Sequence, residues 1–223
     1  MDEIREQHKK MKGKSLKEKF QYFWEYYRVA TLIIILAVIF VANLIYTIVT
    51  AKDSAFYAIL INGYTTMDTE TYMEGFEEYA QIDTKQYTAT LEANFTIDEN
   101  SMDSYTAANI QKFAAQVAAK ELDAMFAETD TFQKYADNGY LGNLEELLPA
   151  ETLAAYKDRL LYADLPDDDT EEEVPVGVQV ADCAFLQESG AYAGQDEVYF
   201  GVIVNSEHAD MAAEFLDYIF QES

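Results

Sequence analysis

The first pattern along the chain is an uncharged apolar run at residues 29–50, VATLIIILAVIFVANLIYTIVT. A helix of this length covers roughly 33 Å at about 1.5 Å per residue, enough to cross the hydrocarbon core of a bilayer. Asn43 is its one strongly polar side chain, and no polar stripe runs along it, whereas a helix packed on a globular core carries such a stripe. The pattern predicts a transmembrane helix over residues 29–51.

Charge differs sharply between the two sides of this run. Residues 1–50 hold eight Lys and Arg against five Asp and Glu, whereas residues 51–223 hold seven against thirty-six. Basic residues close to a span stay in the cytoplasm, so we expect a single-pass protein of the cell membrane with its amino terminus inside and its carboxyl-terminal domain outside. The basic lead is long, the apolar run exceeds an h-region of about 7–15 residues, and no A-x-A-like site follows, which favours an uncleaved signal anchor.

Aromatic residues crowd the segment just before the span. Such rings settle at the headgroup level and predict an interfacial belt, although a groove for a partner helix fits the same residues. Ser15 and Glu18 have the spacing of a capping box, so one helix is expected to run from near Ser15 to near Thr50. Residues 1–28 are therefore predicted to form a cytoplasmic basic tail and an interfacial helix. The aromatic residues are Tyr22, Phe23, Trp24, Tyr26 and Tyr27.

Beyond the span, residues 52–223 alternate between strand-like and helix-like segments. Apolar runs and alternating segments rich in β-branched and aromatic residues predict strands at 55–61, 86–97, 122–127, 174–180 and 197–204. Helical spacing predicts helices after caps at Asp68, Asp130 and Ser206, and over 105–120, 141–148 and 150–161. We therefore expect one α/β domain, a single three-layer lobe with a mixed, mostly parallel sheet, preceded by one transmembrane helix.

Composition excludes some kinds of partner for this domain. Its strong negative charge argues against nucleic acid, which is bound by basic surfaces. Cys183 is the sole cysteine and there are two histidines, so neither a disulfide framework nor an ordinary zinc site is expected, and no cofactor is predicted. The acidic segment 167–173, DDDTEEE, offers oxygen ligands for Ca²⁺, but it lacks the ligand spacing of a calcium loop, which favours a solvated charge run.

Familiar catalytic motifs are missing from the sequence. It contains no G-x-S-x-G, H-E-x-x-H, G-x-x-x-x-G-K or G-x-G-x-x-G. These spacings place a nucleophile, a pair of zinc ligands or a phosphate-binding backbone. His8 lies in the basic tail and His208 near the start of the last helix, and neither has a nucleophile beside it in the sequence. We therefore predict that the protein is not an enzyme.

Three stretches of the outer domain resemble the extracytoplasmic solute-binding proteins of ABC importers. They are ELDAMFAETDTFQKYADNGYLGNLEELLP (residues 121–149), VPVGVQVADCAF (174–185) and YFGVIVNSEHADMAAEFLDYIF (199–220). The resemblance implies a lobe whose strands deliver loops to a ligand cleft. Members of that family are usually nearly twice as long and close two lobes on a ligand, whereas 25 residues separate Leu148 from Val174. The chain thus resembles one lobe on a transmembrane stalk.

The resemblance places a ligand site at the carboxyl ends of the strands, where open α/β sheets bind ligands. Structural roles fit several of the same residues: a turn at Asn62-Gly63, helix caps at Asp130 and Ser206, and a small buried side chain at Cys183. No catalytic residue and no metal ligand is predicted. The ligand-binding candidates are Asn62, Gly63, Glu128, Thr129, Asp130, Asp182, Asn205 and Ser206.

These patterns predict a membrane-anchored binding or interaction module that serves as a sensor or an accessory subunit. Its partners are expected to be the lipid bilayer, through residues 29–50, and either a small solute or another membrane protein. The alternative is a structural domain that docks another membrane protein and binds no small molecule.

Overall fold

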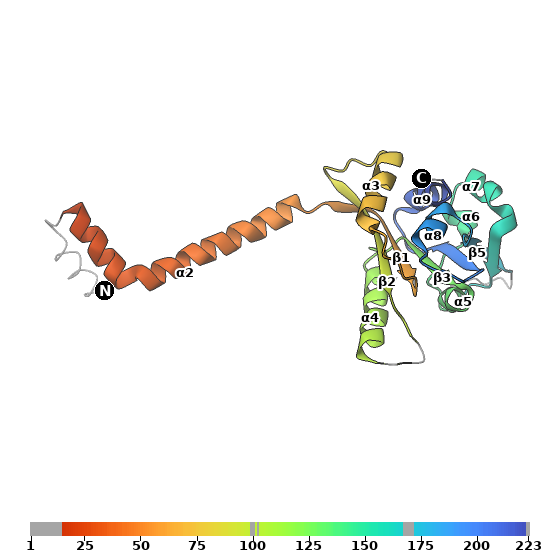
Figure 1. Ribbon diagram of the computed structural model, residues 1–223, viewed down its shortest axis with the longest axis horizontal. Coiled ribbons are helices and arrows are strands. Elements are labelled where there is room, and N and C mark those ends of the chain that lie inside the picture. Colours follow the sequence, from red (N-terminus) through yellow and green to blue (C-terminus); the bar gives the residue numbers. More distant parts are fainter. Residues whose placement is uncertain (1–14, 99–100, 102, 167–171, 222–223) are drawn as a thin grey trace. The chain divides into compact units, whose positions relative to one another are not determined.

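The computed structural model describes residues 15–98, 101, 103–166 and 172–221 (Figure 1). The chain divides into two compact units, Met1–Ala51 and Lys52–Ser223. In the first unit helix α2 runs unbroken over Leu16–Thr50, as predicted. Its stretch Arg28–Thr47 has a mean hydropathy of 2.7 and its apolar window contains no buried residue, so this helix is long and apolar enough to span a membrane. Of the predicted aromatic belt, Trp24 is exposed, and the side chains of Tyr22, Phe23, Tyr26 and Tyr27 lie outside the described part of the chain.

A mixed sheet forms the centre of the second unit and has six strands within the described residues, in the order β2-β1-β3-β6-β5-β4. β1 is parallel to both β2 and β3, whereas β6 is antiparallel to β3 and to β5, and β4 is antiparallel to β5. Parallel pairing is therefore confined to β2-β1-β3, and β6 ends at the sheet edge opposite to the ends of β1 and β3. The strands are β1 (Asp53–Ile61), β2 (Tyr87–Phe95), β3 (Ala124–Glu128), β4 (Leu160–Ala163), β5 (Val174–Gln179) and β6 (Val198–Val202).

Helices cover both faces of the sheet and produce three layers (Figure 1). Successive strand residues point to opposite faces, so Phe56 and Leu60 of β1 enter one core while Ile59 and Ile61 enter the other. The first core is closed chiefly by α3 (Thr69–Tyr79), α8 (Ala184–Ser189) and α9 (Ala209–Ile219) and the second by α4 (Ser104–Ala118) and α5 (Thr129–Asp137). Shorter turns of helix occupy α6 (Leu144–Leu147), α7 (Ala150–Ala155) and Lys157–Arg159.

Several predicted element boundaries are wrong. The helix expected over 150–161 ends at Ala155, and Leu160–Ala163 forms β4 instead, because pairing with β5 prevails over local helix preference. Helix α8 was not predicted, because a helix of six residues that buries only Phe185 and Leu186 is too short to show a helical period of apolar positions. Two of the three expected helix caps also differ from the prediction.

Asp68 caps α3 as predicted, and its Oδ1 accepts hydrogen bonds from the backbone N–H groups of Glu70 and Thr71. Asp130, in contrast, lies inside the first turn of α5, whose cap position is Glu128. Ser206 precedes the true cap position of α9, His208, by two residues, and its Oγ accepts from the backbone N–H of His208 at 3.1 Å. The chain thus turns once more before this last helix begins.

A buried carboxylate on α3 accepts a backbone N–H of the edge strand β2. Glu77 on α3 is 8% exposed, and its Oε1 accepts hydrogen bonds from the backbone N–H of Ala89 at 2.7 Å and from Thr88 Oγ1 at 3.1 Å. The N–H groups of an edge strand otherwise face solvent or an incoming strand. At the other end of the sheet, β4 is four residues long.

The segment considered for Ca²⁺ binding, 167–173, lies mostly outside the described residues, of which it contributes the exposed Glu172 and Glu173. Among the described residues, no group of three or more His, Cys, Asp or Glu side chains is arranged to hold a metal ion.

Candidate functional site at the carboxyl edge of the sheet

The loop after α8, residues 190–197, is fixed to the carboxyl ends of β1 and β3 by one tyrosine. The hydroxyl of the buried Tyr192 lies 2.8 Å from the carbonyl oxygen of Ile61 and 2.9 Å from that of Phe126, and donates between them. Burial raises the pKa of Tyr192 well above its ordinary value, so the phenol keeps the proton that it donates. The backbone supports this attachment, because Tyr64 N–H donates to the carbonyl oxygen of Ala191 at 2.8 Å.

Asn62 and Gly63, which follow β1, give the chain the conformation and the space that the Tyr192 ring requires. A Cβ atom on Gly63 would lie 2.8 Å from the Tyr192 ring, so the ring can cross this point only because the residue is glycine. Asn62 has a φ of 58°, and its carboxamide both donates to and accepts from the backbone of Ile97, at 3.1 and 2.8 Å. Both predicted site residues therefore hold the fold at this edge, and Asn62 also borders the cavity beside it.

Two adjoining cavities lie between the loop and the strand ends, and we call them together the carboxyl-edge hollow. The first has a volume of about 380 Å³ and the second of about 520 Å³, and Glu128 and Gln195 line both. The first is lined by Asn62, Tyr64, Glu128, Gly190, Ala191, Tyr192, Ala193 and Gln195, and the second by Glu128, Thr129, Asp130, Gly194, Gln195, Asp196 and Glu197. The hollow thus unites Asn62, Glu128, Thr129 and Asp130 from the predicted set.

The carboxyl-edge hollow is negatively charged. Glu128, Asp130, Asp196 and Glu197 line it, and its described lining residues include no Lys or Arg. One carboxylate is positioned by a neighbour, because Thr129 Oγ1 donates to Glu197 Oε2 at 3.0 Å. Like charges gathered around a concave surface reinforce one another's potential there, which attracts cations and repels anions.

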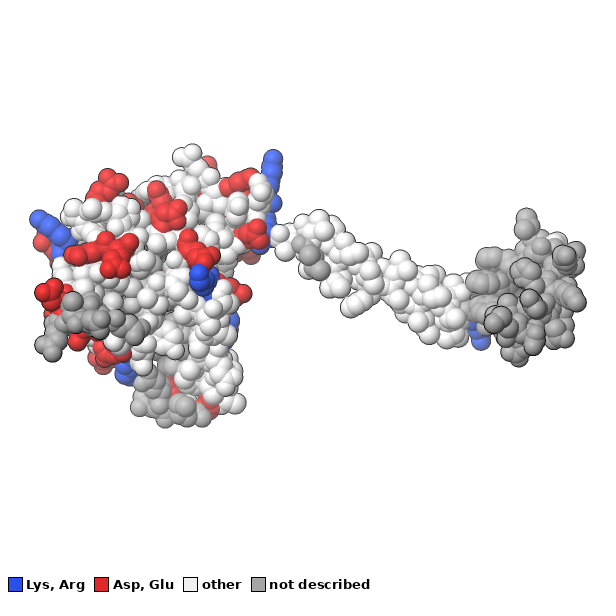
Figure 2. Space-filling view, turned by 180° about the vertical axis from the view of Figure 1, so that it is seen from behind, with Lys and Arg blue, Asp and Glu red and all other residues white. Residues whose placement is uncertain are grey.

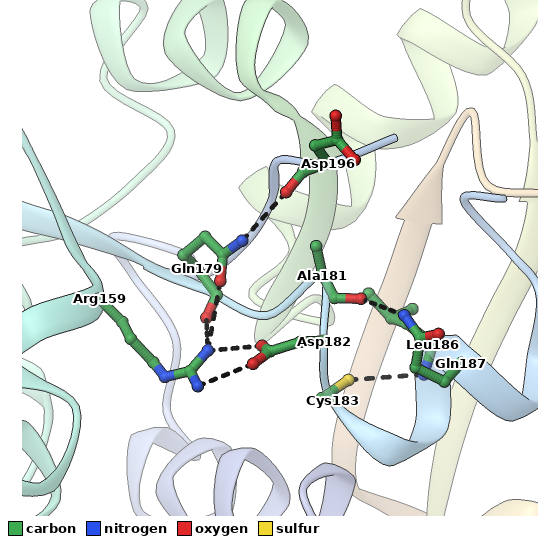
Figure 3. A network of polar contacts seen from close by, with 8 residues as sticks. All are labelled: Arg159, Gln179, Ala181, Asp182, Cys183, Leu186, Gln187 and Asp196. Carbon is green, nitrogen blue, oxygen red and sulfur yellow. Dashed lines mark hydrogen bonds and ion pairs between the residues drawn. The ribbon is translucent and has the colours of Figure 1, made fainter. Parts of the chain in front are cut away.

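Asp182 lies at the same edge but is held in an ion pair (Figure 3). Arg159 Nη1 and Nη2 donate to its two carboxylate oxygens at 2.5 and 2.9 Å, and this pairing lowers the pKa of Asp182 below its ordinary value. Nη1 also donates to Gln179 Oε1 at 3.3 Å, and Gln179 Nε2 donates to the carbonyl oxygen of Asp196 at 3.2 Å. The pair thus supports the end of the 190–197 loop, while Asp182 itself does not line the hollow.

Cys183 is a structural residue at the start of α8. Its Sγ accepts a hydrogen bond from the backbone N–H of Leu186 at 3.5 Å, and its side chain is fully buried. Burial raises the pKa of the thiol to about 12. The reactive form of cysteine is the thiolate, so this residue lacks the chemistry of a nucleophile at neutral pH.

Asn205 and Ser206 lie at the opposite edge of the sheet, because β6 runs antiparallel to β3. There they join a network around Asp123, which is fully buried just before β3. Asp123 accepts hydrogen bonds from the backbone N–H of Tyr57 at 2.9 Å and from Ser206 Oγ at 2.7 Å, and His208 Nδ1 lies 3.1 Å from it. Asn205 Nδ2 donates to the carbonyl oxygen of Val117 at 2.8 Å. These two predicted residues are therefore separated from the other six.

The Ser206, His208 and Asp123 side chains do not have the geometry of a catalytic triad. In a triad the serine hydroxyl contacts the histidine ring, and the carboxylate contacts only the far side of that ring. Here Ser206 Oγ donates to Asp123, which the His208 ring also contacts through Nδ1. The arrangement anchors the start of α9 to the sheet.

Sequence reasoning missed Tyr192 and Asp123, the residues that organise the two edges. Tyr192 sits in the segment SGAYAG, whose glycines mark a loop, but nothing in the sequence indicates a contact with the distant ends of β1 and β3. The sequence does mark Asp123, since it is the single acid in the otherwise apolar segment LDAMFA, residues 122–127. An acid in a buried strand needs several donors around it.

Comparison of the chain with protein-family models, with curated proteins and with solved structures finds no match.

Proposed function

We propose that the chain is a membrane-anchored, extracytoplasmic binding module that takes up a small cationic solute in the carboxyl-edge hollow. The observation that carries this proposal is the cavity of about 380 Å³ that Tyr192 holds open beside Glu128, at the edge where α/β sheets bind ligands. The volume falls within the range of small-molecule sites, about 300–1,000 Å³. A sensor or an accessory subunit of a membrane complex would use such a module.

Two features support the proposal that the chain is anchored in a membrane. The stretch Arg28–Thr47 is apolar and unburied, and charge is divided between eight basic residues before residue 51 and thirty-six acidic residues after it. Acidic side chains are spread over the visible face of the α/β unit in Figure 2, and basic ones are few. The local sequence likeness to solute-binding proteins supports the same function, since its three stretches fold around β3, β5 and β6.

The proposed topology gives a direct expectation for intact cells. Protease added from outside should remove an epitope placed after Ser223 and spare one placed before Met1, because the basic lead holds the amino terminus in the cytoplasm. Immunoblotting of the two epitopes makes the measurement, and the control is lysed cells, in which both should be cut. Protection of the carboxyl-terminal epitope in intact cells would contradict the topology.

Ligand binding is tested with the full chain in detergent by isothermal titration calorimetry. Putrescine, spermidine and arginine are the probes, and glucose and glutamate are the uncharged and anionic comparisons. At least one cation is expected to bind, and Glu128→Gln should weaken it about tenfold, because a hydrogen bond to a charged group contributes about 1.5–3 kcal/mol.

Glu214→Gln is the matched control, since Glu214 is an exposed acid on α9 that does not line the hollow. It should leave the affinity unchanged. If none of the cations binds, or if both variants weaken binding equally, the carboxyl-edge hollow is not the binding site.

A second candidate function, docking of another membrane protein, is favoured by a separate surface. Ile97, Ile110, Phe113, Tyr135 and Tyr140 line a cavity of about 210 Å³ beside α4 and α5. Two large side chains of α4 are also unusually exposed, Tyr105 at 58% and Ile110 at 38%. Docking would be favoured over solute binding by two results together. No probe would bind in the calorimetric titration, and a membrane protein would co-purify with the wild type but not with Ile110→Asp.

A further inference from the structure

Asn43 is the most polar side chain in the apolar part of α2. Thr47 Oγ1 and Thr50 Oγ1 donate to the carbonyl oxygens of Asn43 and Tyr46, one turn earlier, at 3.0 and 2.7 Å. These hydroxyls are therefore satisfied within their own helix. The side-chain carboxamide of Asn43 is exposed and has no hydrogen-bond partner among the described residues.

If α2 spans the bilayer, as proposed above, this carboxamide lies within the hydrocarbon region. Asn43 follows Arg28 by about 22 Å of helix and precedes Thr50 by about 10 Å, at about 1.5 Å per residue. At that depth no water is present to accept hydrogen bonds from its two N–H groups or to donate one to its oxygen. Polar side chains in such positions hydrogen-bond across to another helix.

The residues around Asn43 form a continuous seam for such a helix. Leu36, Ile39, Asn43 and Tyr46 recur at alternating steps of three and four, the spacing that keeps one face toward a supercoiled partner. Leu36, Ile39 and Tyr46 are 57%, 58% and 68% exposed. These four residues carry no charge, so no charge repulsion opposes close packing in lipid.

We propose that α2 self-associates through this seam, with Asn43 hydrogen-bonded to Asn43 of a second copy of the chain. A carboxamide carries both donors and an acceptor, so it is its own complement. In a two-fold dimer each residue on the axis meets its identical counterpart, which places the second carboxamide at the same depth in the membrane. Another protein would need a matching polar group at that one depth.

The test is fluorescence energy transfer between donor-labelled and acceptor-labelled full chains in phosphatidylcholine–phosphatidylglycerol vesicles, measured over a range of protein-to-lipid ratios. The wild type should associate, and Asn43→Leu should weaken the association constant by about 3- to 20-fold, the span measured for interhelical hydrogen bonds in membranes. Asn43→Gln keeps the carboxamide and should retain most of the association. Ile45→Leu is the control, since two residues rotate a helix by about 200° and so place Ile45 on the opposite side.

Flotation of the same vesicles separates the two proposals. A chain that does not float with the vesicles overturns the membrane anchor, and with it the dimer. A chain that floats but remains monomeric at all ratios overturns the dimer alone. So does an Asn43→Leu variant that associates as tightly as the wild type.

Discussion

Phe215→Ala is expected to lower the free energy of unfolding of residues 52–223 by about 3–5 kcal/mol, the usual cost of truncating a buried phenylalanine. Phe215 on α9 is fully buried. Its ring centroid lies 4.8 Å from that of Phe56 on β1 and 4.9 Å from that of Phe76 on α3, so it joins the sheet to two helices. Urea unfolding of this fragment, followed by circular dichroism, measures the change.

Tyr105→Ala is the matched control, because it also removes an aromatic ring but from a side chain that is 58% exposed. It should change the free energy of unfolding by less than about 1 kcal/mol, as surface substitutions usually do. Equal losses in the two variants would mean that Phe215 does not lie at the centre of this core.

Asp123→Ala should destabilise the same fragment by about 3 kcal/mol or more. The substitution leaves the backbone N–H of Tyr57, the Ser206 hydroxyl and the His208 ring without their shared acceptor. These three residues are half-buried, and a polar group that loses its partner away from water costs about 1–3 kcal/mol. Asp123→Asn keeps the shape and one acceptor oxygen, so its loss should be smaller in the same urea experiment.

Glu214→Ala is the control for the charge that Asp123→Ala removes, since Glu214 is exposed on α9. It is expected to be nearly neutral. A near-neutral Asp123→Ala would contradict the view that this network holds the start of α9 to the sheet.

The elements that could be predicted from the sequence are those whose pattern is long and local. The strand at residues 55–61 has an uninterrupted apolar run, and Phe215 and Ile219 recur on one face of the last helix. β4 and α8 could not be predicted in this way. Each has six residues or fewer, and pairing with β5 or packing of Phe185 and Leu186 determines its conformation.

The candidate site was only partly predictable, because a strand's direction leaves no trace in its own side-chain pattern. Glu128 is the last residue of β3 and Asn205 comes shortly after β6, yet β6 runs antiparallel to β3, so the two residues lie at opposite edges. The hollow also depends on Tyr192. Its hydroxyl donates to the backbone of Ile61 and Phe126, which precede it in the chain by 131 and 66 positions. Contacts of this range are set by the packed fold rather than by local sequence.

The two edge strands of the sheet affect whether the α/β units of neighbouring chains are able to pair through their backbones. Chains tethered to one membrane diffuse in two dimensions and collide often, which is the condition under which exposed strands zip together into aggregates. Glu77 already occupies the outward N–H of Ala89, and the four residues of β4 offer little backbone to a neighbour. If α2 anchors the chain in a membrane as proposed, these two features oppose edge-to-edge pairing of crowded α/β units.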